Sequence, residues 1–220
     1  MNQTPEVFEA IAPTNPYSPP PTTNEHDQLF SAECKEDGKD IVRSVYPYIL
    51  DGASVVQLWF RLSQFPILFA SPQQANFKNF TRMLQNDYSV MLRVDDIGII
   101  MITDIVPGVE ARLHLSFWDS KLSGREPLIR EAVRWTMEVL GVRRVSTPVR
   151  ADARAMRAFM ERVGMYFEGA LKNWISNDET NKMYDLYLYG VTKHEVDPHW
   201  LAGRSWAKPR VRLLRAYETS

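Results

Sequence analysis

Residues 111–171 alternate β-branched runs with helical patterns, and this alternation constrains the fold more than any other feature of the sequence. Apolar residues recur at helical spacing over 127–140, between an alternating run at 113–117 and a β-branched run at 142–149. Such an order predicts an α/β unit, in which the central helix begins directly after a strand and a turn. That geometry presents free backbone N–H groups to an anionic ligand.

The two helices of this unit carry clear start and stop signals. Pro127 suits a first helical position, and Glu126 suits the positive N-terminal end of the same helix. Gly141 is placed to close that helix in the left-handed conformation. Asp152 is expected to cap the next helix, which Gly164 would end. The spread of apolar residues around 127–140 predicts a helix held between the sheet and another layer.

The other expected elements follow from periodicity and turn residues. Helices are predicted at 39–50, 54–65 and 72–84. A hairpin is predicted from strands at 88–94 and 98–105, joined by the Asp95-Asp96 turn. After Pro107-Gly108 as the next turn, the remaining strands are expected at 113–117, 142–149, 165–174 and 183–191.

Length and composition limit the class of protein. The chain has 220 residues, 45% of them hydrophobic, which suits one domain with extensions and a real core. We expect a soluble intracellular protein with no membrane contact, because no apolar run is long enough to span a bilayer. The single cysteine, Cys34, excludes an internal disulfide and a cysteine-based metal cluster. We expect Cys34 to be an inert thiol.

The N-terminal segment, residues 1–30, is expected to be an extended arm. It contains six prolines, which fix φ and remove backbone donors, so it cannot join a helix or a central strand. Residues 1–40 carry eight acidic and two basic side chains, a net charge of -6, which leaves +5 on the rest of the chain. Solvated ends explain this asymmetry most simply, and docking to a charged partner is the alternative.

The C-terminal segment, residues 193–220, forms a basic, aromatic extension beyond the domain expected at 31–192. It mixes Trp200, Trp206 and Tyr217 with arginines and lysines. Aromatic and basic residues together bind nucleic acid in some proteins, but they also anchor protein interfaces. No nucleic-acid fold signature accompanies them, so we expect a protein partner or a second copy at the arm and the extension. An amphipathic closing helix on the chain's own domain is the plainest alternative for the extension. His194 and His199 do not form a metal site, and no metal is expected.

Two stretches carry a resemblance to a known family. EAVRWTMEVLGVRRV at 131–145 and RAFMERVGMYFEGAL at 157–171 resemble the second half of the GCN5-related N-acetyltransferase (GNAT) superfamily. The nearest branch is the one that acetylates ribosomal-protein N-termini, where a pattern of the type ExxGFxxEG is typical. That pattern stands here as Glu161, Gly164, Met165, Glu168 and Gly169. The resemblance implies an α/β fold with a mixed central sheet, splayed at its middle, flanked by helices and holding acyl-coenzyme A in a V-shaped gap.

The resemblance also implies a cofactor site. In the superfamily, a turn of the type (Gln/Arg)xxGx(Gly/Ala) cradles the cofactor's diphosphate at the start of a helix. The corresponding residues are Lys121, Leu122, Ser123, Gly124, Arg125 and Glu126, with Phe117 before the turn and Asp152 at the next helix. Gly124 matches the pattern, while Glu126 replaces a small residue and adds a negative charge that Lys121 and Arg125 could offset. An ordinary capped turn with two solvated basic residues is the equal alternative.

Catalytic groups are less well matched. The family's Asn at the start of the fourth helix falls at Asp152 or Ala153, and the Tyr that protonates the leaving thiolate falls at Met160. For the base, His114 and Asp119 are the candidates, since a strand residue beside the cradle could reach an amine through one water. A histidine satisfied on a half-buried strand and a turn carboxylate are the plainer readings.

Two functions from different classes remain open on the sequence. The first is acyl-coenzyme A-dependent transfer of an acetyl group to an amine, such as a protein N-terminus, by direct attack. The second is the same fold with a degenerate site, acting as a structural or assembly component of a larger complex such as a virus particle. The first places the chain in the cytoplasm, and the second allows a viral particle.

Overall fold

The computed structural model of the chain describes residues 28–48, 52–63, 76–84, 89–119, 121–177 and 182–196. Nearly all of the predicted arm and most of the predicted extension lie outside these residues, so the partner contacts expected of them stay predictions. Among the described residues, no helix is long and apolar enough to cross a membrane.

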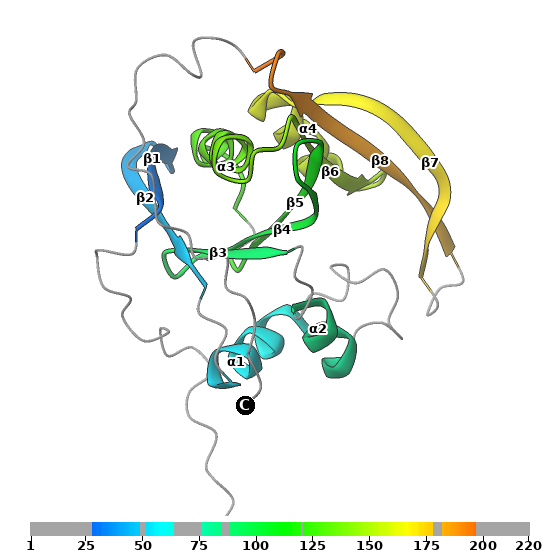
Figure 1. Cartoon of the computed structure of the whole chain (residues 1–220), viewed down its shortest axis with the longest axis horizontal. Coiled ribbons are helices and arrows are strands. Elements are labelled where there is room, and N and C mark those ends of the chain that lie inside the picture. Colours follow the sequence, from blue (N-terminus) through cyan, green and yellow to red (C-terminus); the bar gives the residue numbers. More distant parts are fainter. Residues whose placement is uncertain are drawn as a thin grey trace, which may run out of the picture.

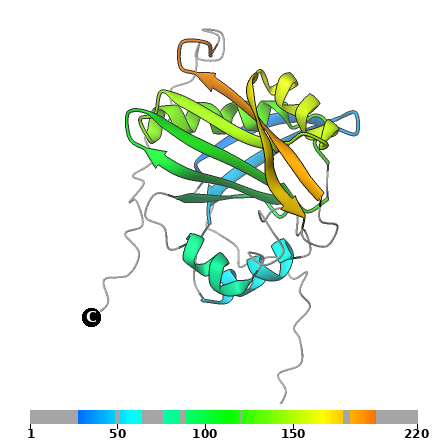
Figure 2. The same ribbon diagram turned by 90° about the vertical axis from the view of Figure 1, so that its right-hand side faces the viewer.

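One mixed sheet forms the centre of the molecule (Figures 1 and 2). Its strand order is β1-β2-β3-β4-β5-β6-β8-β7, and every neighbouring pair is antiparallel except β5 and β6. The strands are β1 (Phe30–Glu36), β2 (Lys39–Pro47), β3 (Val90–Val94), β4 (Gly98–Val106), β5 (Glu110–Phe117), β6 (Arg144–Arg150), β7 (Tyr166–Asn177) and β8 (Lys182–Thr192). The predicted fold class, a mixed sheet flanked by helices, is confirmed.

Helices cover both faces of this sheet (Figure 1). They are α1 (Gly52–Ser63), α2 (Phe77–Leu84), α3 (Glu126–Val139) and α4 (Arg154–Val163). The larger core lies under α3 and α4 and contains Trp135, Leu113 and Phe159. The smaller core lies under α1 and α2 around Leu58 and Phe80. As predicted, α3 is held between layers, because it contacts β1, β6 and α4.

The predicted helix at 39–50 is wrong, because residues 39–47 form β2 in a hairpin with β1. Asp37 and Gly38 have φ of 51° and 77°, the two successive positive values that a tight hairpin turn requires. Glu36 pairs with Lys39 directly across this turn. The β-branched residues of β2 fit helical spacing and strand spacing equally well over so short a range, and the Asp-Gly turn decides between them.

Most of the remaining predicted elements are present. The predicted helix at 54–65 corresponds to α1, and the later part of the helix predicted at 72–84 corresponds to α2; residues 64–75 lie outside the described part. The hairpin β3–β4 and the pairing of β7 with β8 are confirmed. Gly164 ends α4 with φ of 100° and donates its N–H to Met160 O and Glu161 O.

The expected capping role of Asp152 is wrong. Ala153 occupies the N-cap of α4, and no side chain makes a capping hydrogen bond there. The Asp152 carboxylate instead accepts two hydrogen bonds from Arg150, at 2.7 and 2.6 Å. A planar bidentate pair with a guanidinium competes successfully with a single backbone N–H for the same carboxylate.

Candidate functional site

Strands β5 and β6 part halfway along their length. Their parallel ladder joins residues 110–112 to residues 144–146 and goes no further, although both strands continue. At the point of parting, Thr147 Oγ1 donates a 2.7 Å hydrogen bond to the Leu113 carbonyl oxygen. Beyond it, the facing edges of β5 and β6 are not paired with each other. This parting of β5 and β6 agrees with the splayed sheet that the resemblance implies, in which the cofactor's acyl arm would lie.

The turn between β5 and α3, residues 121–125, lies against β1. Lys35 N–H donates to Gly124 O at 3.1 Å, so the turn extends the edge of the sheet by one backbone hydrogen bond. Gly124 has φ of 85°, and a Cβ atom at this position would lie 1.9 Å from Lys35 O. Only glycine allows so close an approach in this conformation. The turn is therefore fixed by the β1–β2 hairpin as well as by α3.

Arg125 is fully buried beneath this turn, with 0% of its side chain exposed. Its guanidinium donates to both carboxylate oxygens of Glu36, at 3.1 and 3.0 Å, and to both of Asp119, at 2.8 and 2.6 Å. A fifth hydrogen bond, of 2.8 Å, goes to Lys121 O. A guanidinium has five N–H donors, so all of them are used within the protein. No donor of Arg125 is left for a phosphate group.

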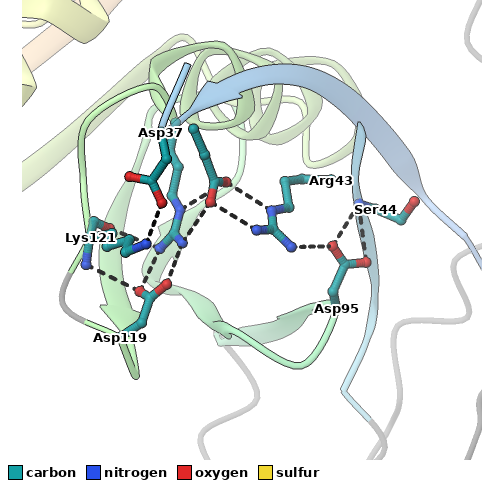
Figure 3. A network of polar contacts seen from close by, with 8 residues as sticks. Asp37, Arg43, Ser44, Asp95, Asp119 and Lys121 are labelled. Atoms are coloured by element: carbon teal, nitrogen blue, oxygen red, sulfur yellow. Dashed lines mark hydrogen bonds and ion pairs between the residues drawn. The ribbon is translucent and has the colours of Figure 1, made fainter. Parts of the chain in front are cut away.

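Glu36 joins this arginine to the β1–β2 hairpin. Figure 3 draws the surrounding polar contacts, with Arg43, Asp95 and Asp119 labelled. The Glu36 carboxylate also accepts two hydrogen bonds of 2.8 Å from Arg43, which in turn lies 3.6 Å from Asp95. Hydrogen bonds from Arg43 and then from Arg125 outweigh the effect of burial and lower the pKa of Glu36 from 4.5 to about 2. We call Glu36, Arg43, Asp95, Asp119 and Arg125 the Glu36 network. It ties the turn to β1 and β2 through charge-assisted hydrogen bonds and to the β3–β4 turn through the Arg43–Asp95 ion pair.

Lys121 and Ser123 are the exposed side chains of the turn, whereas Leu122 is half-buried against the larger core. Lys121 Nζ lies 2.6 Å from an Asp37 carboxylate oxygen, and the two side chains are 52% and 72% exposed. An ion pair this exposed contributes little to stability, so Lys121 is free to exchange Asp37 for a ligand. It is the basic residue of the turn that a bound anion could recruit.

Glu126, at the first turn of α3, is paired with a residue from α4. Arg162 Nε donates a 2.7 Å hydrogen bond to its carboxylate, and the Glu126 side chain is 14% exposed. Burial acts to raise the pKa of Glu126, but Arg162 and the backbone N–H groups of Glu126 and Gly124 hold it below its usual value. The carboxylate is therefore ionised at neutral pH and interacts with backbone donors at the start of α3.

An open groove of about 590 Å³ runs past this carboxylate. Its lining comes from β1, the start of β2, the start of α3 and the end of α4. The charged residues in its wall are Glu33, Asp40, Glu126, Lys35, Arg130 and Arg162. Acidic and basic side chains are equal in number, so the groove has no net charge from its wall.

The candidate bases lie in different surroundings. His114 Nε2 is 3.0 Å from Thr103 Oγ1, and His114 pairs across the sheet with Met101, which packs against the smaller core. Burial lowers the pKa of His114, so the ring is neutral at pH 7. Asp119 is held in the Glu36 network: although burial acts against it, hydrogen bonds from Arg125 and from Lys121 N–H lower its pKa. A carboxylate stabilised in this way is a weak base.

The structure thus brings together one part of the predicted site. Phe117 lies beneath the turn, 4.7 Å from the guanidinium carbon of Arg125, so it sits beside the predicted cradle. His114 lies on the opposite face of the sheet, since Leu113 and Phe117 are packed under α3. Asp152 is at the far end of β6, paired with Arg150. The cofactor and catalytic roles of these residues stay predictions.

Two residues of the site are not among those that the sequence predicts. Glu36 and Arg43 are not among the predicted site residues, because a helix at 39–50 gives Arg43 no cross-strand partner and leaves Glu36 outside any predicted element. The Asp37-Gly38 dipeptide was the signal that could have found them, since it is a strong hairpin turn sequence. Within the described residues, no group of three or more His, Cys, Asp or Glu side chains could hold a metal ion.

A mixed sheet that parts between two parallel strands, followed by a turn and a helix, is the GNAT fold, and this chain has it. No protein-family model and no curated protein matches the sequence. Among solved structures, Mycobacterium smegmatis RimJ in complex with CoA-disulfide is similar with a TM-score of 0.59 and 15% identity, over 80% of this chain and 93% of that one. Spermidine N-acetyltransferase from Vibrio cholerae, in complex with CoA and spermine, is similar with a TM-score of 0.56 and 13% identity, over 70% and 97%. Identities this low show the fold alone.

Coenzyme A, the cofactor that the fold implies, fits this chain only in part. The parted strands offer unpaired backbone for the acyl arm, as in the splayed sheet that the resemblance predicted. The turn that should receive the diphosphate does not fit. Arg125 is saturated, and the ionised carboxylate of Glu126 lies among the backbone donors that a diphosphate would need.

Proposed function

We propose that this chain is a non-catalytic GNAT-fold protein that serves as a structural or assembly component. The observation that carries the proposal is the complete internal satisfaction of Arg125, in which five hydrogen bonds link the expected cradle to β1 and to Asp119. The turn is used to hold the β1–β2 hairpin in place. A turn with this structural task cannot rearrange around a cofactor without breaking a buried charge network.

The position expected for the proton donor supports the same conclusion. Met160 stands there with 0% exposure and packs in the larger core beside Phe159, which is also fully buried. Neither side chain can donate a proton to a leaving thiolate. An acyl transfer would need another donor, and Tyr189, a buried tyrosine on β8, already donates to Glu161 at 3.3 Å.

An assembly role needs a surface for a partner, and the β7–β8 hairpin offers one. β7 is the last strand of the sheet and is not paired along its outer edge within the described residues. Exposed fractions of 58% for Tyr166, 52% for Phe167 and 64% for Trp174 are high for such large side chains. Aromatic residues on an exposed edge are typical of protein interfaces.

A second candidate is acyl-coenzyme A-dependent transfer of an acetyl group to an amine, including a protein N-terminus. It is favoured by the parting of β5 and β6 and by His114, a neutral imidazole on the face that α1 and α2 cover. In this candidate His114 would accept the amine's proton, with Thr103 holding the ring at 3.0 Å. When bound, the cofactor would supply the activated thioester carbonyl.

Isothermal calorimetry with acetyl-coenzyme A separates the two candidates. The non-catalytic proposal expects no binding at concentrations up to about 1 mM, which corresponds to a binding free energy weaker than about 4 kcal/mol. Micromolar binding by the wild-type chain, weakened by Lys121→Ala, would refute it and favour the acyltransferase. Lys78→Ala, which removes an exposed lysine of α2, serves as the matched control.

A further inference from the structure

The start of α3 holds a negative charge of the protein's own where the fold would place a diphosphate. Glu126 is the first residue of α3, and Pro127 beside it has no N–H, so the donors at this helix end come from few residues. The backbone N–H groups of Gly124 and Glu126 both act on the Glu126 carboxylate and help to lower its pKa. The carboxylate therefore places a negative charge at the helix end where a phosphate group would be favoured.

Arg162 holds this carboxylate in place. Its Nε donates to Glu126 at 2.7 Å, while the Arg162 side chain remains 50% exposed at the edge of the groove. Arg130, one turn further along α3, donates to Arg162 O at 2.6 Å and to Val163 O at 3.0 Å, so the end of α4 is fixed beside the start of α3. This arrangement keeps the cation of Arg162 within reach of Glu126 without relying on the two flexible side chains alone.

We propose that Glu126 excludes coenzyme A from this chain by acting as an internal substitute for the cofactor's diphosphate, with Arg162 as its counterion. A diphosphate entering the turn would meet a carboxylate at the start of α3 and would find the adjacent guanidinium already paired. The charges in the groove wall lead to the same expectation. Three acidic and three basic side chains line it, and removal of Glu126 leaves an excess of one positive charge.

The inference rests on the proposed function, since both hold that the wild-type chain takes no coenzyme A, but it identifies one residue as the cause. The ordinary alternative is that Glu126 only stabilises the helix, because an acidic side chain in the first turn interacts favourably with the helix dipole. These readings differ in one measurable respect. If Glu126 only stabilises the helix, its replacement gives a less stable protein that binds coenzyme A no better than the wild type does.

The experiment compares Glu126→Ala with Glu138→Ala by isothermal calorimetry, using coenzyme A and, as a probe without the diphosphate, pantetheine. Glu138 lies on the same helix, is exposed and lies outside the groove wall, so its variant loses the same charge elsewhere. We expect Glu126→Ala to bind coenzyme A at least about tenfold more tightly than the wild type, and pantetheine no better. The double variant Glu126→Ala/Arg162→Ala is expected to lose that gain.

The outcomes distinguish the two proposals. If the wild type does not bind and Glu126→Ala binds no better than Glu138→Ala, this inference is overturned while the proposed function stands. If the wild type binds coenzyme A at micromolar concentration, the proposed function and the inference are both overturned. Circular dichroism verifies that each variant is folded. Glu126→Gln, which removes the charge and keeps the size, is the second test, and a gain in neither variant overturns the inference.

Discussion

Replacing Glu36 by glutamine should destabilise the protein strongly at neutral pH and much less in acid. Glu36 is 5% exposed and accepts hydrogen bonds from two guanidinium groups, which lower its pKa from 4.5 to about 2. A shift of this size corresponds to roughly 3 kcal/mol of stability at pH 7. Since the folded pKa is lowered, that stability is present above pH 4.5 and is lost as the pH falls toward 2.

The measurement is urea unfolding followed by circular dichroism, on the wild type and Glu36→Gln, at pH 7 and pH 3. The difference in unfolding free energy should be roughly 3 kcal/mol at pH 7 and fall to about half of that at pH 3, because pH 3 lies between the folded pKa of about 2 and the ordinary value of 4.5. Glu33→Gln, an exposed position on the same strand, should change stability by less than about 0.5 kcal/mol. A difference for Glu36→Gln that is the same at both pH values, or below about 1 kcal/mol at pH 7, would refute the reasoning.

Three further predictions concern single residues. Gly124→Ala should cost more than about 2 kcal/mol, because its Cβ would lie 1.9 Å from Lys35 O, whereas Gly108→Ala, at a similar φ but in open space, should cost about 1 kcal/mol by urea unfolding. Cys34 should react with a thiol reagent only as the protein unfolds, since burial raises the pKa of its thiol to about 11; rapid reaction of the folded protein at pH 8 would contradict this. The pKa of His114, followed by NMR titration, should lie below 6.5, so that acid destabilises the fold by charging a buried ring; a value above 6.5 would show that the ring is not buried as described.

Much of the fold was decided by local sequence. The unit from β5 to β6 was predictable because Pro127 and Gly141 mark the limits of α3, and because an alternating run precedes the helix and a β-branched run follows it. The hairpin β3–β4 followed from two apolar runs around one short turn. Such signals are local: each depends on the backbone preferences of a few consecutive residues, which the rest of the molecule reinforces.

The candidate site was decided by tertiary structure. Nothing in the sequence near Arg125 indicates that its partner is Glu36, 89 residues away. Nor does it indicate that Arg162 comes back to Glu126 from the end of another helix. The turn Lys121–Glu126 reads as a degenerate phosphate cradle in sequence, and whether its charges face a ligand or one another depends on which strand packs beside it. β1 packs there: Lys35 N–H donates to Gly124 O, and the Glu36 carboxylate accepts hydrogen bonds from Arg125. The buried Arg125 guanidinium is stable only because every one of its donors is satisfied.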